Sequence, residues 1–315
     1  AGAPPMPGHL PEIKVPETVR RLPVLAMAAN PWSPLLAAAG YGHIRLFDIS
    51  SQQPIGALGF PEGIPQVVKF SRNGGVLLAA GGKPVQSGSV VLFDVRTGKR
   101  LAQLGDELDA VMAADISPDQ RLVALGGAGR VVKVYSTEDA TLRFKAARHT
   151  DWITAIAFSP DGKQLATADR AGGIHLWDAR TGGILLSLAN HSAAIRGLAW
   201  RSDSKLLASG GEDGKLIWWN TTDGFMVTVH VRPHAPARVP GTFGKLPSGV
   251  LAVSFASDGR LLSSGRDKLA RLWKTDGSQA KTYSYAPATP TAVAISYDGR
   301  TVIVGDASGM VHFSE

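Results

Sequence analysis

The chain has 315 residues, a net charge of +7 and no cysteine, so disulfides, thiol nucleophiles and cysteine-ligated metal centres are excluded. No apolar run approaches the roughly 18 residues that a membrane-spanning helix needs, and the lysines and arginines are scattered rather than gathered into a nucleic-acid-binding run. We therefore expect a globular protein that neither inserts into a membrane nor binds nucleic acid.

The first elements in chain order are a linker and a lone strand. Residues 1–11 are rich in proline and glycine, which predicts a linker or N-terminal extension, as in a mature or excised fragment of a longer protein. The segment EIKVP at 12–16 follows and has the composition of a short strand. We expect it to supply the outer strand of the last structural unit and so to tie the two ends of the chain together.

From there the chain repeats itself. A short motif such as HLWDARTG at 175–182 returns with its aromatic residue 40 to 54 positions apart, and a Ser-Pro-Asp-Gly type of turn precedes most copies. The seven aromatic positions are Phe47, Phe93, Tyr135, Trp177, Trp219, Trp273 and Phe313. Two independent signals with one period indicate a repeat architecture.

Each repeat reads as four short strands. In the fourth repeat these are ITAIAF, QLATA, IHLWD and ILLSL, several of them apolar on both faces. Sheets that hide both faces must stack on other sheets, which predicts a seven-bladed β-propeller of four-stranded antiparallel blades in one domain over 12–315. The expected blades are 23–60, 64–105, 110–147, 150–190, 193–231, 248–286 and 288–315, the last completed by 12–16.

The stretch HTDWITAIAFSPDGKQLATADRAGGIHLWDARTG at 149–182 resembles a repeat of the WD-repeat (tryptophan–aspartate) β-propeller family, and the likeness extends over nearly the whole chain. The resemblance implies a buried hydrogen-bonded tetrad in the fifth blade, formed by His191, Ser209, Asp213 and Trp219. Because no strained nucleophile turn accompanies it, we interpret this Ser-His-Asp set as structural rather than hydrolytic.

Two neighbouring blades match the tetrad in part. The sixth blade supplies Ser263, Asp267 and Trp273 but has no clear histidine. The fourth supplies His149, Thr167 and Trp177, with Ala171 where the turn aspartate is expected. The sequence therefore predicts an incomplete network.

A finer resemblance concerns the second blade. Its elongated turn, GGKPVQSGSVVLFD at 81–94, together with the fourth-blade motif, is similar to bacterial WD-repeat domains that follow c-type cytochrome domains in envelope proteins. That likeness implies an exported or periplasmic protein. The chain itself contains no heme-attachment motif, so any cytochrome would lie outside it.

The propeller geometry predicts a binding surface where loops around the central channel share one face. Projecting the repeat onto this face nominates Gln66, Trp152, Thr154, Arg170, Arg196, Glu212 and Arg266. A tryptophan beside several arginines is typical of interface hot spots, and guanidinium groups favour an acidic or phosphorylated partner segment. The alternative is that Trp152 simply packs on its own blade.

The longest irregular segment, 230–249, is basic and contains no acid. It is predicted to be a mobile or contact arm over the same face, with Arg232 and Lys245 touching the partner, and its deletion is expected to leave thermal stability nearly intact. His230 and His234 lie four apart, but Pro233 makes a zinc-binding helix improbable, so both are expected in a solvated loop.

No catalytic constellation emerges, and we expect no catalytic residue, cofactor or metal. The leading hypothesis is a monomeric, non-catalytic protein–protein interaction scaffold that binds a protein or peptide on the loop face around the central channel. One alternative is an accessory domain of a larger exported protein with a cytochrome or hydrolase module. The other is a propeller enzyme or small-ligand binder that uses the central channel, although the inner strands offer mostly Ala, Val, Ile and Thr.

Overall fold

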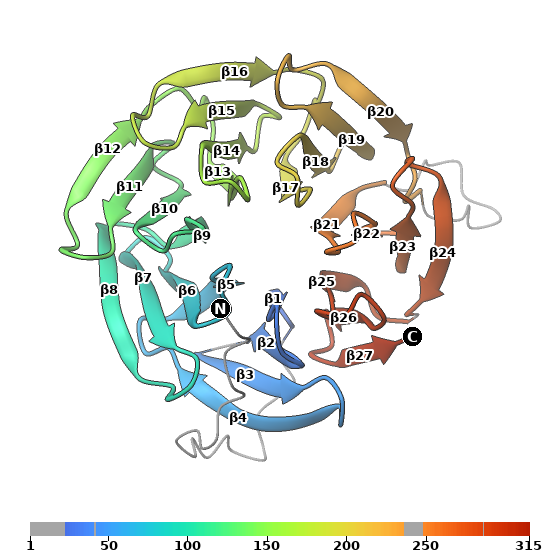
Figure 1. The fold of residues 1–315 in the computed structure, drawn as a ribbon, viewed down its shortest axis with the longest axis horizontal. Coiled ribbons are helices and arrows are strands. Elements are labelled where there is room, and N and C mark those ends of the chain that lie inside the picture. The colour runs from blue at the N-terminus through green and yellow to red at the C-terminus, as the bar shows by residue number, and fades with distance from the viewer. Residues whose placement is uncertain (1–22, 41, 236–247, 286) are drawn as a thin grey trace.

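The computed structural model describes residues 23–40, 42–235, 248–285 and 287–315. These residues form 27 strands and no helix, arranged as six four-stranded antiparallel sheets and one three-stranded sheet. The sheets surround a central opening like the blades of a propeller (Figure 1). The predicted all-β, seven-bladed architecture is therefore confirmed.

The strands follow one another from the axis outward in every blade. Blades one to four comprise β1 (Ala26–Ala29), β2 (Leu35–Ala39), β3 (His43–Asp48), β4 (Gln53–Gly59), β5 (Ile64–Phe70), β6 (Val76–Lys83), β7 (Ser87–Asp94), β8 (Arg100–Glu107), β9 (Val111–Ile116), β10 (Leu122–Gly127), β11 (Val132–Ser136), β12 (Leu142–Ala146), β13 (Ile153–Phe158), β14 (Gln164–Asp169), β15 (Ile174–Asp178) and β16 (Ile184–Leu188). Blades five to seven comprise β17 (Ile195–Trp200), β18 (Leu206–Gly211), β19 (Lys215–Asn220), β20 (Met226–Val231), β21 (Val250–Phe255), β22 (Leu261–Gly265), β23 (Leu269–Trp273), β24 (Gln279–Ser284), β25 (Pro290–Ile295), β26 (Val302–Asp306) and β27 (Val311–Ser314).

The recurring Ser-Pro-Asp-Gly turn fixes the first hairpin of a blade. In blade four the Ser159 hydroxyl lies 2.6 Å from Asp161 Oδ1 and accepts a hydrogen bond from the backbone N–H of Gln164 at 2.9 Å. Gly162 adopts a φ of 73°, a left-handed conformation that glycine reaches without strain. The turn residues thus set the register of β13 against β14.

The apolar faces of the blades are hidden against the neighbouring blades. One buried cluster joins Ala166 and Leu176 of blade four to Leu198, Ile217 and Trp219 of blade five, and comparable clusters join other adjacent blades. Burial of both faces explains why the second strand of a blade, as in β14 and β18, is a nearly continuous run of buried residues instead of an alternating sequence.

The ring closes where blade one meets blade seven. Val24, only 1% exposed, belongs to an apolar cluster with Met27, Ala292 and Ile303. Its backbone N–H donates to the carbonyl of Asp306 at 3.0 Å, and its own carbonyl accepts the Thr291 hydroxyl at 2.6 Å. The predicted closing strand at 12–16 lies outside the described residues.

Candidate functional site

The structure brings together all four tetrad residues of blade five. The His191 Nδ1–H donates to Asp213 at 3.0 Å, and His191 Nε2 lies 2.8 Å from the Ser209 hydroxyl. The indole N–H of Trp219 donates to the same hydroxyl at 2.8 Å. The tetrad therefore forms one chain of hydrogen bonds from the turn aspartate to the tryptophan on β19, and each of its buried polar groups has a partner.

In blade four the structure corrects the sequence prediction. The carboxylate that pairs with His149 belongs to Asp169, whose Oδ2 lies 2.8 Å from His149 Nδ1, and not to the turn position occupied by Ala171. The Thr167 hydroxyl completes the set, 2.7 Å from His149 Nε2 and 2.8 Å from Trp177 Nε1. Asp169 stands where blade five has Gly211, so the carboxylate reaches the histidine from two residues earlier in the hairpin.

Blade six has the histidine that the sequence did not reveal. His234 is fully buried, with Nδ1 2.9 Å from Asp267 Oδ1 and Nε2 2.8 Å from the Ser263 hydroxyl. The Trp273 indole donates to that hydroxyl at 2.8 Å. The expectation of an incomplete tetrad in this blade was wrong because its histidine comes from the long connection after β20.

The same finding corrects the prediction of a solvated loop from 230 to 249. His230 belongs to strand β20, and its Nε2–H donates to the carbonyl of Gly277 at 2.9 Å, while its ring lies 4.5 Å from that of Trp273. Since His234 is buried in the tetrad, the start of the segment is part of the core and its removal would cost stability. Residues 236–247, which include Lys245, lie outside the described residues.

The tetrads are unsuited to hydrolysis because no substrate can reach them. The hydroxyl residues Thr167, Ser209 and Ser263 are all 0% exposed. Burial lowers the pKa of His149 and of His234, in each case against the opposing effect of the aspartate partner, so that the neutral ring is favoured. Each hydroxyl is already committed to a histidine and an indole, which is the arrangement of a structural network.

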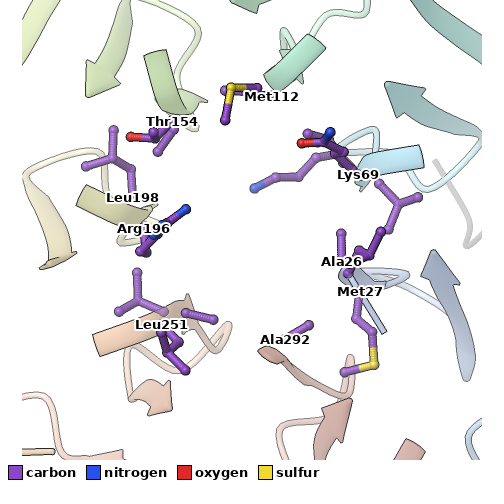
Figure 2. Close-up of a pocket in the computed structure, with 18 of the residues that line it drawn as sticks. Ala26, Met27, Lys69, Met112, Thr154, Arg196, Leu198, Leu251 and Ala292 are labelled. Carbon is purple, nitrogen blue, oxygen red and sulfur yellow. The ribbon is translucent and has the colours of Figure 1, made fainter. Parts of the chain in front are cut away.

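The nominated contact residues belong to the face on which the innermost strand of each blade begins; we call this the entry face. Gln66, Thr154 and Arg196 line the mouth of the central channel, a cavity of about 190 Å³. Figure 2 shows Arg196 and Leu251 on one side of this opening and Lys69 on the other. The Thr154 hydroxyl donates to the carbonyl of Ile195 at 2.6 Å and so ties blade four to blade five.

Two arginines of the entry face share one carboxylate. Glu212 Oε1 accepts from Arg196 at 2.6 Å and from Arg266 at 3.2 Å, which links blades five and six across their interface. All three side chains are partly exposed. One carboxylate against two guanidinium groups leaves a net positive charge beside the channel mouth.

The Trp152 ring is 40% exposed on the same face, and the guanidinium of Arg170 lies over it, 4.4 Å from the ring centre. Arg170 also pairs with Asp151 at 3.2 Å. Trp152 therefore contacts its own blade through one ring face while a large part of the residue stays open to solvent. Arg232 is exposed after β20, and its backbone N–H donates to the carbonyl of Gly214 at 2.7 Å.

Asp169 and His234 are the residues that reasoning from sequence missed. A usable signal existed for the aspartate, because ADRAG at 168–172 and GDASG at 305–309 share an aspartate three residues before a glycine. Asp306 of blade seven is likewise buried, and it pairs with His312 at 2.7 Å. His234 had no such signal, since its distance from the next strand differs from that in blades four and five.

Among the described residues, no group of three or more potential metal ligands comes together. Within that same part of the chain, no helix has the length and hydropathy needed to cross a membrane.

Comparison with known proteins supports the reading of the repeats. The family model described as "WD domain, G-beta repeat" matches residues 141–178, 182–220 and 240–274. No curated protein matches the chain significantly. The three matched repeats cover the aromatic and aspartate positions of the blades that carry the tetrads. Together with the seven-bladed ring, they identify the chain as a WD-repeat β-propeller.

Proposed function

We propose that this protein is a non-catalytic scaffold whose entry face binds an acidic protein or peptide segment. Propellers of the WD-repeat family serve in general as platforms for protein interaction and are typically non-catalytic. The exposed side chains of the entry face favour this face as the binding surface and an acidic segment as the partner.

The observation that carries the proposal is the combination of an exposed aromatic ring and arginines around one channel mouth. Trp152 offers a flat apolar surface, and tryptophan and arginine are the residues most enriched among interface hot spots. Within the described residues, the arginines Arg170, Arg196 and Arg266 form ion pairs with only two carboxylates, Asp151 and Glu212. The surplus positive charge favours carboxylates or phosphates, which guanidinium groups bind through paired hydrogen bonds.

The test is selection of binders from a displayed library of random peptides, followed by fluorescence anisotropy with the selected peptides. We expect acidic peptides to be enriched and to bind the double variant Arg196→Ala/Arg266→Ala, or Trp152→Ala, at least tenfold more weakly. The matched control is Trp32→Ala, which removes a tryptophan that is also solvent-exposed, at 54%, from the opposite face.

Selected peptides that bind all of these variants as tightly as the unaltered protein would overturn the entry-face assignment. Enrichment of basic or purely apolar peptides would overturn the acidic partner.

A further inference from the structure

A second hollow opens on the opposite face of the propeller, where the innermost strands end; we call this the exit face. Its volume is about 610 Å³, within the roughly 300–1,000 Å³ typical of small-molecule sites. The first-to-second-strand turns of several blades form its rim, and it meets the entry-face cavity at residues that line both, namely Met27, Lys69 and Val293. This hollow is separate from the surface proposed above.

The walls of the hollow are rich in aromatic and apolar side chains. Trp32 is 54% exposed there, yet it is held in place because its indole N–H donates to the carbonyl of Arg72 at 2.7 Å and its backbone N–H to Asn30 at 2.9 Å. Tyr297, 43% exposed, stands on the rim as part of blade seven. Other apolar lining residues are Phe70, Trp200 and Phe255. The rings form a preformed apolar surface of the kind that organic ligands contact.

The charges in this hollow have one sign. Lys69 and Arg72 line it, and its lining residues include no aspartate or glutamate. Lys69 extends into the central channel (Figure 2). Neither the Lys69 ammonium nor the Arg72 guanidinium has a hydrogen bond or ion pair with any residue that the structure describes. The half-buried Lys69 thus carries a positive charge into a channel lined also by methionine, leucine and valine, with no ion-pair partner among the described residues, so an anion beside it would be stabilising.

Asp115, a carboxyl that interacts electrostatically with Lys69, does not fill this role. Asp115, on the adjacent strand β9, accepts the backbone N–H of Phe158 at 2.8 Å and that of Ile116 at 3.0 Å. Burial raises the pKa of Asp115, an effect that the Lys69 charge opposes. The carboxylate is thus occupied by the backbone and forms no ion pair with Lys69 in the described part of the chain.

We propose that the exit-face hollow binds a small amphipathic organic anion. Its carboxylate or phosphate lies on the Lys69 ammonium at the inner end, and its apolar body runs outward between Trp32 and Tyr297. Arg72 lies three positions after Lys69, in the turn that follows β5, so at most about 10 Å of chain separates the inner charge from the rim, which gives room for a short apolar body. Arg72 adds positive potential at the mouth and attracts the anion.

Titration calorimetry with three probes separates the parts of this proposal. Octanoate has both the anion and the apolar body, 1-octanol has the body alone, and acetate has the anion alone. We expect octanoate to bind with one-to-one stoichiometry, and 1-octanol and acetate to bind at least tenfold more weakly. Lys69→Met is expected to weaken octanoate binding at least tenfold, and Trp32→Ala severalfold. The control Lys99→Met alters an exposed lysine of blade two and should change nothing.

Several results would overturn the proposal. Absence of saturable octanoate binding would do so, as would equal affinity for 1-octanol or for acetate, or equal binding by Lys69→Met. A thermal melt establishes that Lys69→Met is folded. Trp32→Ala provides a second test of the site, because the loss of a largely exposed ring should leave the protein folded. The entry-face variant Arg196→Ala/Arg266→Ala should bind octanoate normally, and a loss of binding there would move the site to the other mouth.

Discussion

Three histidine side chains of this protein, those of His149, His191 and His234, are 0% exposed. Each spans a carboxylate and a hydroxyl, and these polar atoms must pair with one another because water cannot reach them. The pKa of Asp267 shows the balance: burial raises it, but the hydrogen bond from His234 and the nearby Arg271 outweigh burial and hold the pKa below its usual value. The network is therefore most stable with neutral His149 and His234 rings and with an ionised Asp267 carboxylate.

Acidification should therefore destabilise the protein in a defined window. A histidine whose pKa is lowered by folding binds its proton more readily in the unfolded chain, so the free energy of unfolding should fall as the pH drops below about 6.5. His149 and His234 act in this direction. His175 does so too, because its burial and the neighbouring His149 lower its pKa to about 4. The lowered aspartate pKa values matter only below about 3.8.

Urea denaturation at pH 7.5, 6 and 5 measures this effect. The variant His234→Gln should show a shallower pH dependence because it removes one of the buried titrating rings. A free energy of unfolding that stays constant from pH 7.5 to 5 would contradict the prediction.

The blade-five tetrad shows what single residues reveal in a sequence. Its four members stand at the family spacing, so they could be named before the fold was known. Asp169 was missed because a carboxylate can reach the same histidine from either of two hairpin positions, and the spacing to glycine that it shares with Asp306 was the one signal for the position that is used. Gly211 occupies the alternative position in blade five, where a Cβ would lie 2.7 Å from the His191 ring.

Among the strands, β20 and the connection that follows it differ most from expectation. The periodic pattern identified the strand itself, since alternation and turn residues are local properties. The pattern could not show that the chain returns inward after Val231 and buries His234 under blade six. Such a return is a long-range contact, which composition and periodicity do not encode.

Substitution of His234 by alanine tests whether this connection belongs to the core. The change leaves Asp267 and the Ser263 hydroxyl without their buried partner, which should lower the free energy of unfolding by about 1–3 kcal/mol. Arg232→Ala, two residues earlier and exposed, should alter it by less than about 0.5 kcal/mol. Chemical denaturation of both variants provides the comparison, and an equal effect of the two would refute the core assignment.

For the molecule as a whole, the decisive feature is that the ring is closed. The repeat count and the doubly apolar strands were enough to predict seven blades, because each sheet had to hide both faces. Closure by the strand at 12–16 stays a prediction, because those residues lie outside the described part of the chain. Within that part, the contact between blades one and seven rests on Val24, which packs against Ile303 and Gly305 and bonds to Asp306.

A charge at this closing contact should open the ring. Val24→Asp removes a buried side chain and places a carboxylate in an apolar cluster, so we expect the free energy of unfolding to fall by about 3 kcal/mol or more. Leu25→Asp is the matched control, because Leu25 is 41% exposed at the channel mouth. Thermal and urea denaturation should separate the two variants clearly, and similar stability of both would show that closure does not depend on Val24.

The tetrad aspartates have one more consequence, for recognition. Each tetrad aspartate is the direct sequence neighbour of an entry-face residue: Asp169 of Arg170, Asp213 of Glu212 and Asp267 of Arg266. Their carboxylates also bind the backbone of the same turns, as in the bonds from Gly173 at 2.8 Å and from Lys215 at 3.0 Å. The entry-face side chains are thus held in place by the turns beneath them, and the complex proposed above would lose little conformational entropy on forming.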